Sequence, residues 1–316
     1  RADRQPEFTQ IDIEMSFGDE DTIFAVVEDL MQNIFKETKN YTLEDHFVRI
    51  PWAECMRRFG SDKPDMRFGN EIQDITSVFE NTEFQVFKNT IENGGVVNCV
   101  KFENAADKYS RKGLDQLQDF VKHGFKAKAL AYLKMENDLL TGSIAKVLSE
   151  EEKAKLIEKL GLANNDLVLV IADSARIAQI SLGALRVRLG HELNLIPTEE
   201  TYKFLWVTDF PMFEYSEEDQ RWVAAHHPFT APKEEDVDKL FTDPGHVSSR
   251  AYDLVLNGYE LLSGSIRIHS QELQAKVFEA IGLSLEDAKA RFGFFLDSFR
   301  YGTPPHGGVG IGLERL

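Results

Sequence analysis

Apolar and polar residues alternate near the start of the chain. From Phe8 to Glu14 the sequence reads F-T-Q-I-D-I-E, and the alternation after Phe8 is typical of a strand with one polar face. Gln10, Asp12 and Glu14 should share that face, because every second side chain of a strand points the same way. Residues 19–37 then carry apolar positions at helical spacing with acids in the first turn, which predicts a helix.

A loop dense in Gly, Pro and Asp, RFGSDKPDMRFGN, separates this region from one with a different pattern. After residue 74, strand-like and helix-like segments alternate. The predicted strands are VVNCVKF, ALAYLKM and DLVLVIAD. The predicted helices are SRKGLDQLQDFVKHGF, SEEEKAKLIEKLGL, which has a capping-box start, and ARIAQISLGALRVRLGHEL.

Near residue 201 the pattern returns to long strands and Gly-rich turns, in FLWVTDFPMF, AYDLVLNGYELLSGSIRIH and GGVGIGLERL. We therefore predict that residues 74–200 are a domain inserted into a core made of residues 1–73 and 201–316. Insertion is tolerated where the ends of the inserted domain lie close together. The predicted fold class is α+β: an antiparallel sheet with flanking helices, interrupted by an α/β insertion.

Composition narrows the class of protein. The chain has 316 residues, 42% apolar and 28% charged, which is ordinary for a globular protein with room for two domains. The net charge of −17 means that any nucleic-acid contact must use a local basic patch. Cys55 and Cys99 are too few for a disulfide framework. No apolar run approaches the roughly 20 residues of a membrane span, and no signal-like segment is present. We expect a cytoplasmic protein.

Three charged residues, Asp253, Glu260 and Arg267, are spaced seven apart in a strand-like region. An odd separation places two side chains on opposite faces of a regular strand. A β-bulge at residues 257–258 would return both carboxylates to one face, and a turn at residues 263–264 would bring the arginine beside them. Such carboxylates suit Mg²⁺, and an arginine grips a carboxylate with two hydrogen bonds. On pattern alone, a charged strand face with surface ion pairs is the favoured reading, and the metal and carboxylate site is the alternative.

Two adjacent histidines, His226 and His227, precede a proline in AAHHPFT. Neighbouring residues of a strand point to opposite faces, so one of the two is expected to enter a site, and simple packing is the alternative. Arg4 and Phe8 combine a cation with a ring, which suits a nucleotide's phosphate and base. The run GGVGIGLERL has neither the phosphate-loop spacing nor G-x-G-x-x-G, since its glycines alternate along a predicted strand.

Taken together, these stretches resemble the class II aminoacyl-tRNA synthetases. RADRQPEFTQID resembles the second half of their motif 2, with Arg4 and Phe8 as its R-x-x-x-F element, and GIGLERL resembles the start of motif 3, with Arg315 as its arginine. RFGSDKPDMR, LWVTDFPMFE, HHPFT and NGYELLSGSIRIH are similar to the aspartyl subgroup. The insertion resembles the GAD domain of the bacterial and organellar type.

The resemblance covers essentially the whole chain and begins and ends inside motifs. It implies a fragment that lacks the anticodon-binding OB-fold domain, motif 1 with its dimer surface, and the end of motif 3. The implied reaction activates L-aspartate with ATP and Mg²⁺ to aspartyl-adenylate and then transfers the aspartyl group to tRNA(Asp). The full-length protein is expected to be a homodimer, and a fragment that is inactive for want of its first half is a further alternative.

The resemblance also implies roles for individual residues. Phe8 would stack on one face of the adenine, and Arg315 would cover the other face. Asp253 and Glu260 would hold Mg²⁺. The implied ATP-binding residues are Arg4, Gln5, Phe8, Glu260, Gly312, Leu313, Glu314 and Arg315. The residues implied for aspartate are Arg267 for its side-chain carboxylate, Asp12 for its ammonium group, and His226 near the substrate.

One position departs from the family pattern. The bacterial aspartyl sequence in motif 3 is usually G-L-D-R, whereas Glu314 stands at the acidic position here. Glutamate is common there in related synthetases, so asparaginyl or lysyl specificity is an alternative, against which Arg267 and the GAD-like insertion argue. Two further alternatives are an enzyme that also charges tRNA(Asn) and a synthetase-like paralogue that binds amino acid or RNA without aminoacylation.

Overall fold

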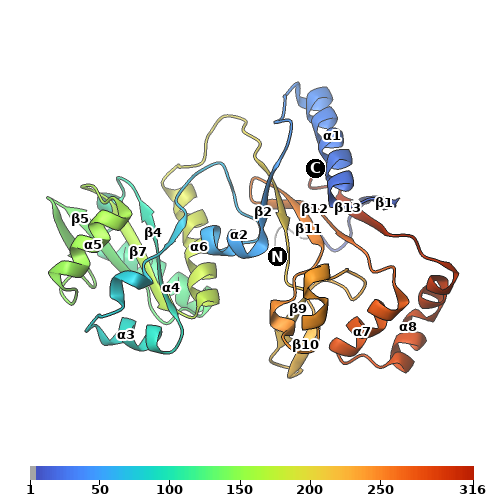
Figure 1. The fold of residues 1–316 in the computed structure, drawn as a ribbon. Helices are drawn as coiled ribbons and strands as arrows, with labels where there is room; N and C mark the ends of the chain where they lie inside the picture. Colours follow the sequence, from blue (N-terminus) through green and yellow to red (C-terminus); the bar gives the residue numbers. More distant parts are fainter. Residues whose placement is uncertain (1–4) are drawn as a thin grey trace. The chain divides into compact units, whose positions relative to one another are not determined.

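The computed structural model describes residues 5–316, which form two compact units (Figure 1). The first unit consists of the residues up to Ala53 together with Tyr202–Leu316, and the second is Glu54–Thr201. Arg4, one of the predicted ATP-binding residues, lies outside the described residues. No helix within residues 5–316 is both long and apolar enough to cross a membrane.

The first unit is built on a six-stranded sheet in the order β1-β13-β12-β11-β8-β2. Neighbouring strands run antiparallel except β8 and β2, which are parallel. The strands and helices of this unit are β1 (Gln10–Ser16), α1 (Glu20–Lys39), β2 (Val48–Pro51), β8 (Phe204–Thr208), β9 (Phe213–Ser216), β10 (Arg221–Ala224), β11 (Ala251–Leu256), β12 (Tyr259–Ile266), α7 (Gln271–Ala280), α8 (Leu285–Ser298) and β13 (His306–Gly312). The predicted antiparallel sheet with flanking helices is confirmed.

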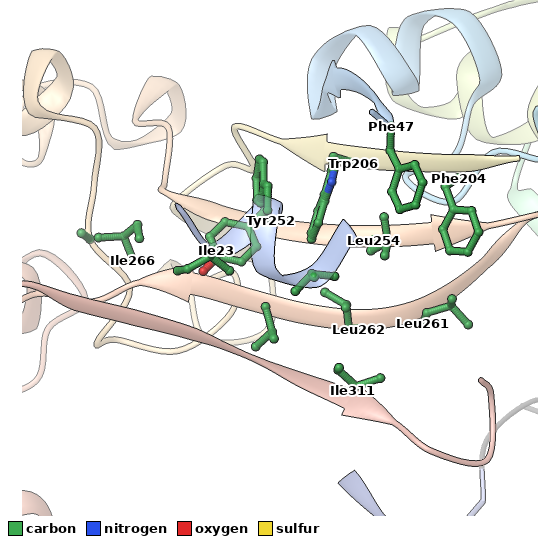
Figure 2. Close-up of a cluster of buried hydrophobic side chains, with 14 of the residues drawn as sticks. Ile23, Phe47, Phe204, Trp206, Tyr252, Leu254, Leu261, Leu262, Ile266 and Ile311 are labelled. Carbon is green, nitrogen blue, oxygen red and sulfur yellow. The ribbon is translucent and has the colours of Figure 1, made fainter. Parts of the chain in front are cut away.

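Helix α1 covers one face of this sheet because its apolar positions recur every three or four residues. It begins after Asp19, whose carboxylate accepts a hydrogen bond from the Thr22 backbone N–H at 2.9 Å, an N-cap that satisfies a free donor of the first turn. The ring of Phe24 stacks on that of Trp206 at 4.0 Å, inside a buried apolar cluster. Figure 2 shows this cluster, with side chains from the sheet strands gathered along one face, Leu254 among them. The opposite face of the sheet carries polar side chains on β1 and β12, next to buried apolar residues of β8 and β11, Val207 and Val255 among them.

The hairpin of β11 and β12 differs from the sequence prediction. Asn257 and Gly258 form its two-residue turn, with φ of 51° and 90°. The predicted bulge at this pair is wrong, because Asn-Gly adopts positive φ readily and closes a tight hairpin instead. The predicted turn at Ser263 and Gly264 is also wrong, since both lie inside β12. Arg267 consequently follows directly after the end of one long strand.

The second unit contains a five-stranded sheet in the order β3-β4-β7-β5-β6. The alternation predicted from the sequence is present, and the Ser149–Glu152 capping box starts α5 as expected. All neighbouring strands pair antiparallel, however, unlike the parallel pairing typical of α/β domains. Its elements, including the α2 helix that leads into it, are α2 (Trp52–Phe59), β3 (Ile72–Asp74), α3 (Gln85–Glu92), β4 (Val96–Phe102), α4 (Arg111–Phe125), β5 (Ala131–Glu136), β6 (Leu139–Gly142), α5 (Glu150–Leu160), β7 (Leu167–Asp173) and α6 (Ala175–Glu192).

The second unit begins well before residue 74 because the Gly- and Asp-rich loop packs on α6. Arg186 of α6 is 1% exposed and donates hydrogen bonds to four backbone carbonyls of the loop. Its guanidinium also lies 4.1 Å from the centre of the Phe68 ring. At Gly60 a side-chain carbon would come within 1.9 Å of the Gln179 carbonyl oxygen, so only glycine permits this approach. Composition predicted a loop here, and long-range contacts decide to which unit it belongs.

Candidate active site

The polar face of the first unit's sheet is organised in rows that run across the strands. The register places Asp253, Ser263, Gly310 and Asp12 side by side on β11, β12, β13 and β1. These residues alternate with those that face α1, so their side chains project from the other face. The absence of a side chain at Gly310 leaves the middle of the row shallow, with acids at both ends.

Glu260 joins the same face through a bulge. The register of β11 and β12 shifts after Leu254, which pairs with Leu262, so that Val255 pairs with Glu260 and Leu261 is the additional residue. The two carboxylates of Asp253 and Glu260 thereby become diagonal neighbours on one face, with a spacing of roughly 7–8 Å between their Cα atoms. The prediction that a bulge brings them to a shared face is confirmed, with the bulge within β12 instead of at the turn.

A cavity of about 330 Å³ opens beside this face. That volume is within the range of small-molecule sites. Its lining residues are Gln5, Phe8, Gln10, Glu260, Leu261, Leu262, Ser263, Gly310, Gly312, Glu314 and Arg315. Six of the residues predicted to bind ATP are in this set, while Leu313 is not. The ring of Phe8 is 60% exposed, which leaves it accessible to a planar ligand.

The two ends of the first unit meet at the cavity. Arg315 donates a hydrogen bond from Nη1 to the Glu260 carbonyl oxygen at 2.7 Å. The Glu314 carboxylate accepts from the Thr9 backbone N–H through Oε1 at 2.8 Å and Oε2 at 3.0 Å. These bonds hold the pKa of Glu314 below its usual value. Glu314 therefore extends the pairing of β1 and β13 next to Phe8.

A second group of charged residues surrounds Arg267. Its guanidinium donates from Nη1 to His227 Nε2 at 2.6 Å and from Nη2 to Glu14 Oε1 at 3.2 Å. The Arg267 Nε is buried and has no hydrogen-bond acceptor within residues 5–316. Burial, and then the neighbouring arginine, lower the pKa of His227 to about 4. His227 is thus neutral near pH 7 and can accept the hydrogen bond of the guanidinium.

The structure places His227, and not His226, against Arg267. His226 is exposed, and its ring lies 4.9 Å from that of Phe210. Sequence analysis expected one of the pair to enter the site, because adjacent residues of a strand diverge, and the family resemblance implied that this residue is His226. The spacing offered no signal for choosing between them.

Asp12 lies on the same sheet face as Glu14, one strand repeat away, which is about 7 Å. Since Glu14 contacts Arg267, Asp12 lies one strand repeat away from the residue that holds this guanidinium. Sequence analysis grouped Gln10 and Glu14 with Asp12 on this face but gave neither a role. Ser263 and Gly310 were not singled out for the site, since only the strand register brings them there.

Comparisons with known proteins identify the family of the chain. A family model described as "tRNA synthetases class II (D, K and N)" matches residues 1–316. The chain is 49% identical over 316 residues to the aspartate--tRNA ligase of Staphylococcus carnosus, covering 100% of this chain and 53% of that protein. The corresponding enzyme of Listeria monocytogenes is 52% identical over the same shares. The aspartate--tRNA(Asp/Asn) ligase of Anoxybacillus flavithermus is 48% identical, again over 100% and 53%. The chain spans about half the length of these relatives.

Proposed function

Because the chain belongs to the class II tRNA synthetases of the D, K and N group, we propose that the protein ligates L-aspartate to tRNA(Asp) through an aspartyl-adenylate intermediate. The observation that carries this proposal is Arg267, whose guanidinium lies on the polar sheet face beside Glu14 and close to Asp12. An amino acid with a negatively charged side chain fits between a cation and a carboxylate. Relatives about 50% identical over the whole chain support the same substrate.

Aspartate is held by charge at both of its ends. Its side-chain carboxylate pairs with the fork of Arg267, replacing or joining Glu14, and its ammonium group donates to Asp12. Asparagine carries a neutral amide at the same place and would offer the half-buried guanidinium no second negative charge. The neutral His227 adds no competing positive charge, and its Nε2 holds one side of the guanidinium.

ATP is proposed to occupy the cavity that adjoins this face. Phe8 offers an exposed ring for the adenine, Gln5 a neighbouring amide, and Arg315 a positive charge for the phosphates. The α-carboxylate of aspartate attacks the α-phosphate, and pyrophosphate leaves. This step needs two reactants held in line and negative charge neutralised, and the residues of the site are suited to both. The terminal ribose hydroxyl of the tRNA then takes the aspartyl group and releases AMP.

The residues present fit Mg²⁺. Asp253 and Glu260 offer carboxylate oxygens on one face, and this ion is usually held by one or two carboxylates together with substrate phosphates. Within residues 5–316 no group of three or more His, Cys, Asp or Glu side chains is placed to hold a metal by itself. Bound there, the ion would neutralise phosphate charge.

A second candidate function is charging of both tRNA(Asp) and tRNA(Asn). One relative, 48% identical over the whole chain, carries that dual specificity in its name. Aspartate activation is common to both functions, so the choice requires a charging assay with each tRNA.

The test is ATP–pyrophosphate exchange by the full-length gene product, with aspartate or asparagine as the amino acid. We expect exchange with aspartate alone, and a loss of about 100-fold or more in kcat/KM for Arg267→Ala. Arg267→Lys retains the positive charge but not the two-pronged guanidinium, and it should keep only part of the wild-type kcat/KM. Arg188→Ala, which removes a surface ion pair with Glu192, is the matched control and should keep full activity.

Each outcome of this assay assigns the protein differently. Exchange with asparagine instead of aspartate would move it to the asparaginyl enzymes. No exchange with either amino acid would favour a paralogue that binds its ligands without activating them. Exchange with aspartate that survives Arg267→Ala would contradict the assignment of this arginine.

A further inference from the structure

Gln274 of α7 is 1% exposed and makes one contact with the histidine loop. Its side-chain Nε2 donates a hydrogen bond to the carbonyl oxygen of Pro228 at 2.7 Å. Pro228 is the residue directly after His227, whose Nε2 accepts from Arg267 at 2.6 Å. A buried amide on a separate helix is thus two short links away from the guanidinium of the site.

The loop that follows His227 is already joined to the end of β12 by its backbone. Ile268 N–H donates to the Phe229 carbonyl at 2.9 Å, and Ala231 N–H donates to the Ile266 carbonyl at 2.9 Å. Pro228 has no N–H, so its peptide offers only a carbonyl oxygen, and Gln274 supplies the donor for it. The Gln274 bond therefore adds a side-chain anchor one residue after the histidine, whose ring Nδ1 also lies 3.3 Å from the Phe229 backbone nitrogen and 3.4 Å from Thr230 Oγ1.

The other half of the Gln274 amide is not used. Its Oε1 is buried without a hydrogen-bond partner within residues 5–316. A buried polar atom without a partner costs free energy, so an apolar side chain of similar size would suit the stability of α7 better. The hydrogen bond from Nε2 to the Pro228 carbonyl oxygen therefore explains why a glutamine stands at this buried position.

We infer that Gln274 is a positioning residue for amino-acid recognition: by holding the Pro228 carbonyl it keeps His227 against Arg267 and so aims the guanidinium at the substrate carboxylate. The inference rests on the proposed aspartate site. Gln274 itself touches neither the predicted substrates nor the cavity. Replacing Gln274 should therefore change the KM for aspartate and not the KM for ATP.

Three variants separate positioning from folding. Gln274→Met keeps the length and removes the donor, and Gln274→Glu keeps the shape but only accepts hydrogen bonds when ionised. Val277→Ala, at a fully buried position of the same helix, loosens the packing of α7 while leaving the Pro228 bond in place. It is the matched control for a general weakening of this region.

In pyrophosphate exchange, both Gln274 variants should raise the KM for aspartate by about ten-fold, since a small misplacement of a binding group has large effects. The KM for ATP should stay within about two-fold, and Val277→Ala should change neither constant. An unchanged KM for aspartate in both Gln274 variants would overturn the inference, as would the same rise in Val277→Ala.

A second readout does not depend on catalysis. The Hε1 resonance of His227, assigned by its loss in His227→Gln, should titrate with a pKa of about 4 in the wild-type protein. In Gln274→Met the ring should leave Arg267 and titrate nearer the ordinary value of about 6.5. An unchanged titration in Gln274→Met would overturn the inference, whether or not the protein activates an amino acid. Wild-type protein that exchanges neither amino acid would instead refute the proposed function.

Discussion

Thr9 and Glu314 are 305 positions apart in the chain and are joined by two hydrogen bonds, from one backbone N–H to both oxygens of one carboxylate. The bond pair closes the end of the cavity next to Phe8. Leu313 N–H donates to the Thr9 carbonyl at 2.9 Å, so both backbone groups of Thr9 are engaged. Glu314 thus fixes the backbone of the residue that follows Phe8, whose ring is the predicted partner of adenine.

Shortening or removing this side chain should loosen the ATP site. In Glu314→Ala the Thr9 N–H loses its acceptor, and we expect a several-fold rise in the KM for ATP without a comparable change for aspartate. Glu314→Gln retains one acceptor oxygen and serves as the control, with most of the ATP affinity kept. Equal ATP constants in wild type and Glu314→Ala would show that Phe8 does not depend on this contact.

His227 should make stability depend on pH. Its pKa is lowered to about 4 in the folded protein, against about 6.5 unfolded. Between these two pKa values the unfolded chain binds a proton at His227 and the folded protein does not. The contribution of the neutral ring to stability is therefore complete above pH 6.5 and is lost as the pH falls towards 4. The full shift corresponds to about 3 kcal/mol, which solvent screening of the partly exposed ring reduces.

The measurement is the free energy of unfolding in urea at pH 7, 5.5 and 4.5, for wild type and His227→Gln. The difference between the two proteins isolates this histidine from the many carboxylates that also titrate. We expect wild type to lose more stability than the variant over this range. Parallel pH curves would mean that His227 is not held neutral by burial and Arg267.

Arg186 should be critical for the second unit. Burial lowers the pKa of this guanidinium to about 10, so it remains charged near pH 7, and its N–H groups satisfy four loop carbonyls. Arg186→Met leaves those carbonyls without this donor, for which we expect a loss of about 3–5 kcal/mol. Arg188→Met, on the same helix but in a surface ion pair, should cost less than about 1 kcal/mol. Denaturant unfolding measures both, and similar losses would refute the special role of Arg186.

Two glycines of β13 should respond differently to alanine. A side-chain carbon at Gly308 would lie 2.1 Å from the Ile13 carbonyl oxygen, which is backbone and cannot move alone. At Gly310 the nearest atom is the end of the flexible Gln10 side chain, at 2.8 Å. Gly308→Ala should therefore separate β13 from β1 and destabilise the fold by several kcal/mol.

Gly310→Ala should fold nearly normally, because Gln10 can turn aside. It should instead weaken ATP binding, since the new methyl group projects into the cavity lining. Melting temperatures and ATP titrations of both variants test this contrast. A stable Gly308→Ala protein would contradict the close approach of the two strands.

Local rules determined much of the fold from sequence alone. The strand at residues 96–102 and the capped helix that starts after Ser149 lie where the pattern predicted them. Alternation also placed Asp12 and Glu14 on one face of β1. These features depend on side-chain period, caps and backbone propensity, which involve residues only a few positions apart.

The tertiary structure decided what depends on residues far apart in the chain. Leu261 is the bulged residue, and Glu260 therefore faces the site, because two strands had to keep their apolar sides on the core. His227 and not His226 contacts Arg267 because the loop is held to the end of β12 and to α7. Neither outcome is encoded in a local pattern: each follows from packing and hydrogen bonds that form only when distant segments meet.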